Sequence, residues 1–142
     1  MATRNGSAVW RGDLPSGSGK VVVGDGVFEG DYSFASRFEE GEGTNPEELI
    51  AGAHAACFAM ALSNELATDG HPPDSVEAKA KVHLRNVDGA PTIAQIDLDV
   101  VGAVPGLDAE AFSRYAEQAK ANCPVSRALA GVPQIELSAR LA

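Results

Sequence analysis

The residues in this chain best suited to chemistry are its two cysteines, Cys57 and Cys123. A thiolate is a nucleophile that oxidises reversibly, so two thiols can act as an attacking and a resolving pair if the fold brings them together. Cys57 falls about three turns inside a predicted helix, where burial raises the pKa of a thiol. Cys123 precedes Pro124 at a predicted helix start, which favours the thiolate. From the residues alone, inert packing of Cys57 is the simpler interpretation, and redox chemistry stays open.

His54 lies three residues before Cys57, so a helix would place both side chains on one side. This spacing allows a cysteine–histidine dyad for the hydrolysis of thioesters or similar acyl groups, or two metal ligands. A structural zinc site needs four ligands, and His71, His83 and Cys123 lack the short spacing that such sites use. We therefore expect no metal.

A long helix must position Cys57. Asn45 is a good N-cap, Pro46 suits the first helical position, and the pair Glu47 and Glu48 follows in the first turn, where negative charge is favoured. Asp69-Gly70 and Pro72-Pro73 end the pattern, which gives a helix of about 24 residues and about 36 Å. Small or apolar residues recur along it with a helical period, at Leu49, Ala53, Ala56, Cys57, Met60, Ala61 and Asn64. We interpret it as a central helix.

Short strands are predicted before this helix, at residues 7–10, 20–28 and 31–36, with glycine-rich turns between them. Residues 37–42 form an acidic loop headed by Arg37, which could fold back onto the helix that follows.

After the central helix, residues 76–84 and 94–100 alternate between apolar and polar side chains, which predicts two strands of a hairpin. A helix over 107–122 capped by Asp108, a short helix over 125–130 and an alternating strand over 135–141 complete the chain. The order is βββ-α-ββ-α-β, an α+β fold, and we expect one domain covering residues 1–142.

The chain of 142 residues is acidic, with a net charge of −9 and a pI near 4.6. Nucleic acid and anionic membranes are disfavoured as partners because both attract a positive surface. No apolar stretch follows the N-terminus, and the run from Leu49 to Leu62 is interrupted by His54 and short for a membrane span. We expect a cytoplasmic protein, in which ordinary disulfides stay reduced and the cysteines serve redox chemistry or inert packing.

Three segments carry a resemblance to a known family. Residues 43–50, Gly-Thr-Asn-Pro-Glu-Glu-Leu-Ile, residues 54–62, His-Ala-Ala-Cys-Phe-Ala-Met-Ala-Leu, and residues 119–126, Ala-Lys-Ala-Asn-Cys-Pro-Val-Ser, resemble the signature segments of the OsmC/Ohr family of thiol peroxidases. The similarity covers nearly the whole chain. The segment Ser36-Arg37-Phe38-Glu39 resembles the OsmC branch, in which an arginine occupies this place.

The resemblance implies an intertwined homodimer in which antiparallel sheets wrap around central helices. It also implies an enzyme that reduces organic hydroperoxides, and more weakly hydrogen peroxide, to alcohols in oxidative stress defence. The reactive cysteine of the family falls on Cys57, its resolving cysteine on Cys123, its glutamate on Glu47 and its arginine on Arg37. An external thiol or dithiol would reset the enzyme, and no cofactor is expected.

Thiol chemistry explains such a site. A buried Cys57 needs a cation to remain a thiolate; Arg37 can supply one, and Glu47 can hold the guanidinium in place. Peroxide would oxidise Cys57 to a sulfenic acid, which Cys123 would convert to a disulfide. Glu47 and Cys57 are about 15 Å apart along one helix, so we expect Glu47 of one chain to complete the site of the other.

Two other functions stay open. One is a non-catalytic dimer that binds an apolar ligand in its seam, with Cys57 as packing only. The other is the acyl hydrolase based on Cys57 and His54.

Overall fold

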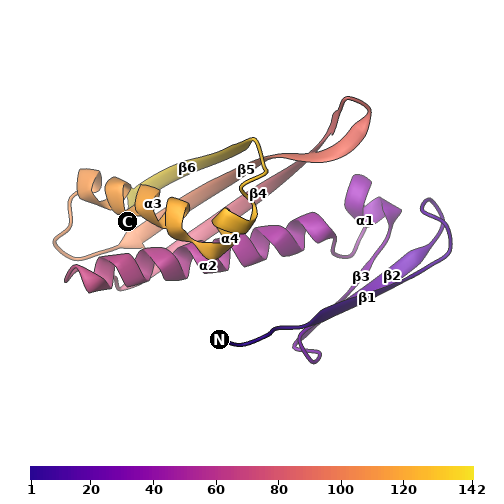
Figure 1. Cartoon of the computed structure of the whole chain (residues 1–142), viewed down its shortest axis with the longest axis horizontal. Coiled ribbons are helices and arrows are strands. Elements are labelled where there is room, and N and C mark those ends of the chain that lie inside the picture. The colour runs from indigo at the N-terminus through magenta and orange to yellow at the C-terminus, as the bar shows by residue number, and fades with distance from the viewer. The chain divides into compact units, whose positions relative to one another are not determined.

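The computed structural model describes all 142 residues as two compact units, residues 1–49 and residues 50–142 (Figure 1). Helix α2 (Pro46–Thr68) begins in the first unit and continues through the second. The elements follow the predicted order, including the short helix predicted over 125–130, with one additional short helix before α2. The single domain expected from the sequence stays a prediction.

The first unit contains a three-stranded antiparallel meander of β1 (Gly6–Arg11), β2 (Ser18–Val23) and β3 (Phe28–Tyr32). The strand predicted at 20–28 ends early because Gly24 and Gly26 adopt positive φ angles of 63° and 98° in a turn that leads into β3. The third predicted strand, 31–36, is also wrong over most of its length, since β3 ends at Tyr32.

A short helix, α1 (Phe34–Phe38), replaces the end of the strand predicted at 31–36 and the first two residues of the loop predicted at 37–42. Ser33 and Ser36 explain it by forming a capping box. The Ser36 backbone N–H donates to the Ser33 hydroxyl at 3.1 Å, and the Ser33 N–H donates to the Ser36 hydroxyl at 2.8 Å. Arg37 therefore lies on a helix, not in a loop.

Helix α2 starts as predicted. The Asn45 side-chain oxygen accepts the Glu48 backbone N–H at 2.8 Å, and Pro46 is the first helical residue. By length and composition α2 could cross a membrane, a property that core helices of soluble proteins share. Here one of its faces packs on a sheet whose other face is polar, which is the architecture of a soluble domain.

The second unit is built on a sheet of β4 (Ser75–Val87), β5 (Ala90–Ala103) and β6 (Gln134–Leu141), in that order. Strands β4 and β5 form the predicted antiparallel hairpin. The expectation of purely antiparallel sheets is wrong, because β6 pairs parallel to β5. The connection between them passes through α3 (Ala109–Asn122) and α4 (Pro124–Ala128), and such a crossover returns the chain in the same direction.

One face of this sheet carries the core, and the helices lie on that side (Figure 1). Phe58, Leu62 and Leu66 of α2 are fully buried against the sheet and α3. The apolar stripe predicted to be the buried side of α2 is not the one that the chain buries, since Met60 is 75% exposed. Alanine and glycine are apolar or neutral all around this helix, so its period did not reveal which face packs inward.

Candidate active site

The fold brings the two cysteines together. Their sulfur atoms lie 2.9 Å apart, and both are free thiols. Cys57 comes from the middle of α2 and is half-buried, whereas Cys123 is fully buried between α3 and α4. This contact places the two thiols where a disulfide between them needs only a small movement.

Cys123 is held from both sides by backbone hydrogen bonds. As the C-cap of α3, it donates its N–H to the Ala119 carbonyl at 2.8 Å, and as the N-cap of α4, its carbonyl accepts the Arg127 N–H at 3.0 Å. Pro124 ends one helix and starts the next, as the sequence predicts. The Cys123 sulfur therefore lies at a fixed junction between α3 and α4.

The two thiols differ in their surroundings. Burial raises the pKa of Cys57, the neighbouring Cys123 thiol raises it further, and a contact with the Val125 backbone N–H opposes both. Burial would also raise the pKa of Cys123, but contacts with Cys57, Ser126 and Val125 outweigh it and lower that pKa. No cation contributes to the pKa of Cys57, so a thiolate on Cys57 requires a positive charge from elsewhere.

The predicted cation and its carboxylate partner meet in the first unit. Arg37 donates to Glu47 through Nη2 at 2.8 Å and through Nε at 3.2 and 3.3 Å. Glu47 is almost fully buried, while Arg37 keeps part of its surface and lies 5.2 Å from the Phe38 ring centre. A bidentate pair of this kind fixes the guanidinium in direction as well as in place.

Hydrogen bonds between α1 and the start of α2 position this ion pair. The Ser36 hydroxyl donates to the Thr44 carbonyl at 2.8 Å, and the Asn45 side-chain amide donates to the Ser36 carbonyl at 2.9 Å. Asn45 therefore caps α2 and holds α1 at the same time. These bonds fix α1 against the start of α2, and so they fix the backbone positions of Arg37 and Glu47 relative to each other.

Helix α2 is unbroken between Glu47 and Cys57. Its rise separates the two residues by about 15 Å along the axis.

His54 does not pair with Cys57. It is fully buried, and its Nε2 lies 2.7 Å from the Ser126 hydroxyl oxygen. Burial lowers its pKa, so the ring is neutral near pH 7. Sequence reasoning missed Ser126, although its place three residues after Cys123, in the first turn of a helix starting at Pro124, was a usable signal.

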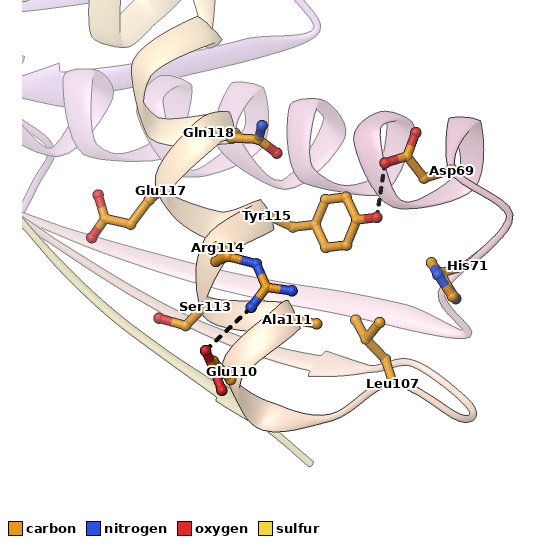
Figure 2. Close-up of a pocket in the computed structure, with 10 residues that line it drawn as sticks. All are labelled: Asp69, His71, Leu107, Glu110, Ala111, Ser113, Arg114, Tyr115, Glu117 and Gln118. Atoms are coloured by element: carbon orange, nitrogen blue, oxygen red, sulfur yellow. Dashed lines mark hydrogen bonds and ion pairs between the residues drawn. The ribbon is translucent and has the colours of Figure 1, made fainter.

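A hollow of about 720 Å³, with several charged and polar residues in its lining, lies elsewhere in the second unit, between α3 and the C-terminal end of α2 (Figure 2). Tyr115 donates to Asp69 at 2.8 Å, and Arg114 pairs with Glu110 at 3.5 Å. The hydrogen bond to Asp69 raises the pKa of Tyr115. Neither cysteine lines the hollow, so it is separate from the redox pair.

Comparison with known proteins agrees with this geometry. The family model described as OsmC-like protein matches residues 39–138, which include both cysteines and Glu47. The chain belongs to the OsmC-like family. Peroxiredoxin OsmC of Escherichia coli is 47% identical over 127 residues, or 89% of each chain, and the organic hydroperoxide resistance protein OhrB of Bacillus subtilis is 30% identical over 122 residues, 84% of this chain and 88% of its own. The higher identity to OsmC agrees with the predicted branch.

Solved structures of this OsmC-like family have the same fold. An organic hydroperoxide resistance protein OsmC from Legionella pneumophila superposes with a TM-score of 0.77 at 25% identity, covering 99% of each chain. The structure of OhrB from Bacillus subtilis gives a TM-score of 0.73 at 28% identity, covering 97% of this chain and 98% of its own. The predicted OsmC-like α+β fold is confirmed.

Proposed function

We propose that this protein is a thiol-dependent peroxidase that reduces organic hydroperoxides, and more weakly hydrogen peroxide, to alcohols. The observation that carries the proposal is the contact of 2.9 Å between two reduced cysteines, one in a helix interior and one at a helix start. The names of the relatives, a peroxiredoxin and organic hydroperoxide resistance proteins, support the same activity and a role in oxidative stress defence.

The reaction consists of two thiol steps. The Cys57 thiolate attacks one peroxide oxygen, the O–O bond breaks, and the alkoxide takes a proton and leaves as an alcohol. Cys57 is then a sulfenic acid. The Cys123 thiolate attacks this sulfur, the S–O bond breaks, and hydroxide takes a proton and leaves as water. An external thiol or dithiol reduces the resulting disulfide and returns both cysteines to thiols.

Arg37 and Glu47 supply the cation that Cys57 lacks, and they do so across two chains. The raised pKa of Cys57 supports the need for a cation, and the paired guanidinium supplies a permanent charge. The unbroken helix between Glu47 and Cys57 argues against a site within one chain. In an antiparallel pair of α2 helices that cross at Gly52, residues 47 and 57 face each other.

A second copy of the chain would cover the exposed face of α2 and form a homodimer. This face carries small residues and the exposed Met60, and a Cβ placed on Gly52 would meet nothing within 4 Å. A helix that is apolar on all sides needs cover on all sides. Both units would act as one domain in such a dimer, which the match of the family model across their boundary supports.

Organic hydroperoxides are the preferred substrates because the chain offers an apolar pocket for their carbon group. A small pocket of about 180 Å³ in the first unit has an almost entirely apolar lining that includes Tyr32, Pro46 and Leu49. An alkyl or aryl group gains free energy in such a place, at about 25 cal/mol for each Å² of apolar surface buried. Hydrogen peroxide has no such group.

The acyl hydrolase is disfavoured because His54 is directed to Ser126 and lacks contact with Cys57. A dimer that only binds a ligand does not account for the contact between two reduced thiols. The redox function also fits a reducing cytoplasm, which supplies thiols to reset the enzyme.

The test of the activity is consumption of an organic hydroperoxide such as cumene hydroperoxide by the reduced protein, with dithiothreitol as reductant. Wild type should turn over, and Cys57→Ser should lose turnover entirely while keeping its fold. Ser63→Ala is a control on the same helix. Equal consumption by wild type and Cys57→Ser would exclude a peroxidase based on Cys57.

Complementation tests the arrangement across two chains. Cys57→Ser and Glu47→Ala homodimers should both be inactive or severely impaired. If Glu47 acts across the interface, their heterodimer contains one site with both defects and one with neither, so about half-normal activity should return. If mixing restores nothing although exchange of subunits is demonstrated, Glu47 acts within its own chain.

A further inference from the structure

Asn45 is buried at the start of α2, and both ends of its side-chain amide form hydrogen bonds. Its oxygen accepts the Glu48 N–H at 2.8 Å, and its nitrogen donates to the Ser36 carbonyl at 2.9 Å. Serine, aspartate and asparagine cap helices about equally well. The chain uses Ser33 as the cap of α1 and Asp108 as the cap of α3, so capping alone does not require an amide at position 45.

The two hydrogen bonds of this amide end on the peptide groups next to the ion pair. The Ser36 carbonyl belongs to the peptide bond that precedes Arg37. The Glu48 N–H belongs to the peptide bond that follows Glu47. Because each peptide group is a planar unit, fixing one of its atoms restricts the whole group. The Asn45 side chain therefore spans the two backbone units from which the Arg37 and Glu47 side chains start.

Ser36 and its neighbours make this connection reciprocal. The Ser36 hydroxyl donates to the Thr44 carbonyl at 2.8 Å, in the peptide bond that precedes Asn45. Ser36 itself lies in α1, a helix of five residues whose last carbonyls have no partner inside the helix. The Asn45 amide gives one of these carbonyls a donor, in a residue that is only 6% exposed. Loss of that donor leaves a buried carbonyl without this partner, which is costly.

The contact between Arg37 and Glu47 is sensitive to where α1 lies. Arg37 reaches the Glu47 carboxylate through Nη2 at 2.8 Å and through Nε at 3.2 Å, and a paired contact of this kind depends on the orientation of both groups. A helix as short as α1 has little stability of its own, so its place depends on the groups to which it is bonded.

We propose that Asn45 is a positioning residue for this ion pair: its side-chain amide sets the place of Arg37 relative to Glu47, in addition to capping α2. The inference rests on the proposed function, in which the pair supplies the charge that the Cys57 thiolate needs. Asn45 acts through Arg37 and Glu47 and takes no part in the thiol steps.

Asn45→Asp separates the cap from the donor. An aspartate oxygen still accepts the Glu48 N–H, whereas no donor is left for the Ser36 carbonyl. Asn45→Ser also keeps a capping oxygen and adds no charge near the ion pair, so agreement between the two variants excludes a charge effect. The matched control is Asp108→Asn, which exchanges the same two side chains at the cap of α3, where the side chain accepts the Ala111 N–H at 2.8 Å.

The first measurement follows the ion pair by NMR and needs no turnover. In protein with isotope-labelled arginine, the Nε–H signal of Arg37 is identified by its absence in Arg37→Met. This hydrogen is bonded to Glu47 in wild type and should exchange slowly with water. In Asn45→Asp and Asn45→Ser its exchange should be about tenfold faster, as expected when a hydrogen bond between charged groups is lost. Asp108→Asn should leave it unchanged.

The second measurement is the property that the pair controls. In a Cys123→Ser background, the pKa of Cys57 from thiolate absorbance should rise by about one unit in Asn45→Asp and Asn45→Ser, which lowers the thiolate fraction below the pKa about tenfold. With both cysteines present, these variants should consume hydroperoxide more slowly by a similar factor. Asp108→Asn should match wild type in both assays.

Wild-type values of the Arg37 exchange and of the Cys57 pKa in both Asn45 variants would overturn the inference. An effect in Asn45→Asp alone would also overturn it, since that pattern indicates the added charge, and so would an equal effect of Asp108→Asn, which indicates capping in general. If wild type fails to consume hydroperoxide, the proposed function fails by itself, and the exchange of the Arg37 hydrogen still decides whether Asn45 positions the pair.

Discussion

At Cys57, burial and the neighbouring thiol of Cys123 both raise the pKa, so the residue expected to be the nucleophile is protonated in the surroundings that its own unit provides. Arg37 and Glu47 form a bidentate ion pair in which Glu47 is almost fully buried and Arg37 is partly exposed. The sequence assigns these four residues to the site through their resemblance to the signature segments of the family, and their roles stay a prediction. The contact of His54 with Ser126 could not be predicted, since it depends on how α4 packs against α2.

Replacing Arg37 with methionine should raise the pKa of Cys57 by about one to three units and slow peroxide reduction severely. The reason is the loss of the cation that stabilises the thiolate, with little loss of packing because the side chain is partly exposed. Thiolate absorbance in a Cys123→Ser background measures the pKa. With the pKa raised, the midpoint of the rate against pH should move upward, because the thiolate is the reactive form.

Arg4→Met is the matched control, since Arg4 is exposed and lies near the N-terminus. Arg37→Lys should restore part of the effect, because an ammonium supplies charge without the two-pronged geometry of the guanidinium. A titration of Cys57 that Arg37→Met leaves unchanged would transfer the role to another cation, with Arg11 or Arg127 the first candidates.

Among the elements, α2 shows most clearly what the sequence can and cannot predict. Its start at Pro46 and its length follow from caps and stop signals, which are local. Its buried face could not be predicted, because small residues surround the helix and only the packing of Phe58 and Leu62 on the sheet decides between faces. Likewise α1 depends on the reciprocal bonds of Ser33 and Ser36, a capping box without the usual glutamate.

Gly102 of β5 lets α3 pack close to the sheet, because the Phe112 ring of α3 lies where a side chain at position 102 would be. A Cβ on Gly102 would lie 2.5 Å from ring atoms of Phe112, so Gly102→Ala must displace that ring. Because α3 ends at Cys123, the displacement should also slow disulfide formation. We expect a loss of about 1–3 kcal/mol in the free energy of unfolding, measured with urea.

Gly131→Ala serves as control for Gly102→Ala, because a Cβ there meets nothing within 4 Å. It should change the free energy of unfolding by less than about 0.5 kcal/mol. If the two substitutions cost the same, the close contact between Phe112 and the sheet does not limit the packing of α3.

For the whole molecule, the proposed homodimer rests on the second face of α2, on which Met60 is exposed. The sequence predicted the order of the elements, the helix that carries Cys57 and the helix junction at Cys123, although it missed the parallel pairing of β6. The direction of β6 follows from the crossover through α3 and α4, which returns the chain parallel to β5, and the alternating pattern of the strand itself does not encode it.

Gly52→Leu tests the crossing of two α2 helices. Leucine has the higher helix propensity by up to about 1 kcal/mol, so the isolated chain should fold at least as well. A leucine side chain at the crossing point should nevertheless keep the helices apart and give a monomer in sedimentation velocity, with loss of peroxidase activity. Gly131→Leu, at an open glycine outside the helices, should remain a dimer. A wild-type protein that is monomeric, or a Gly52→Leu protein that stays an active dimer, would contradict the proposed interface.

The pairing of Cys57 with Cys123 in peroxide reduction is tested most directly by intact mass spectrometry. The reduced protein is treated with one equivalent of an organic hydroperoxide, and the remaining thiols are then blocked with an alkylating reagent. We predict a mass lower by two hydrogens with no alkylation, and a peptide in which Cys57 and Cys123 of one chain are joined. A product in which both cysteines are alkylated, or only bridges between chains, would contradict the mechanism.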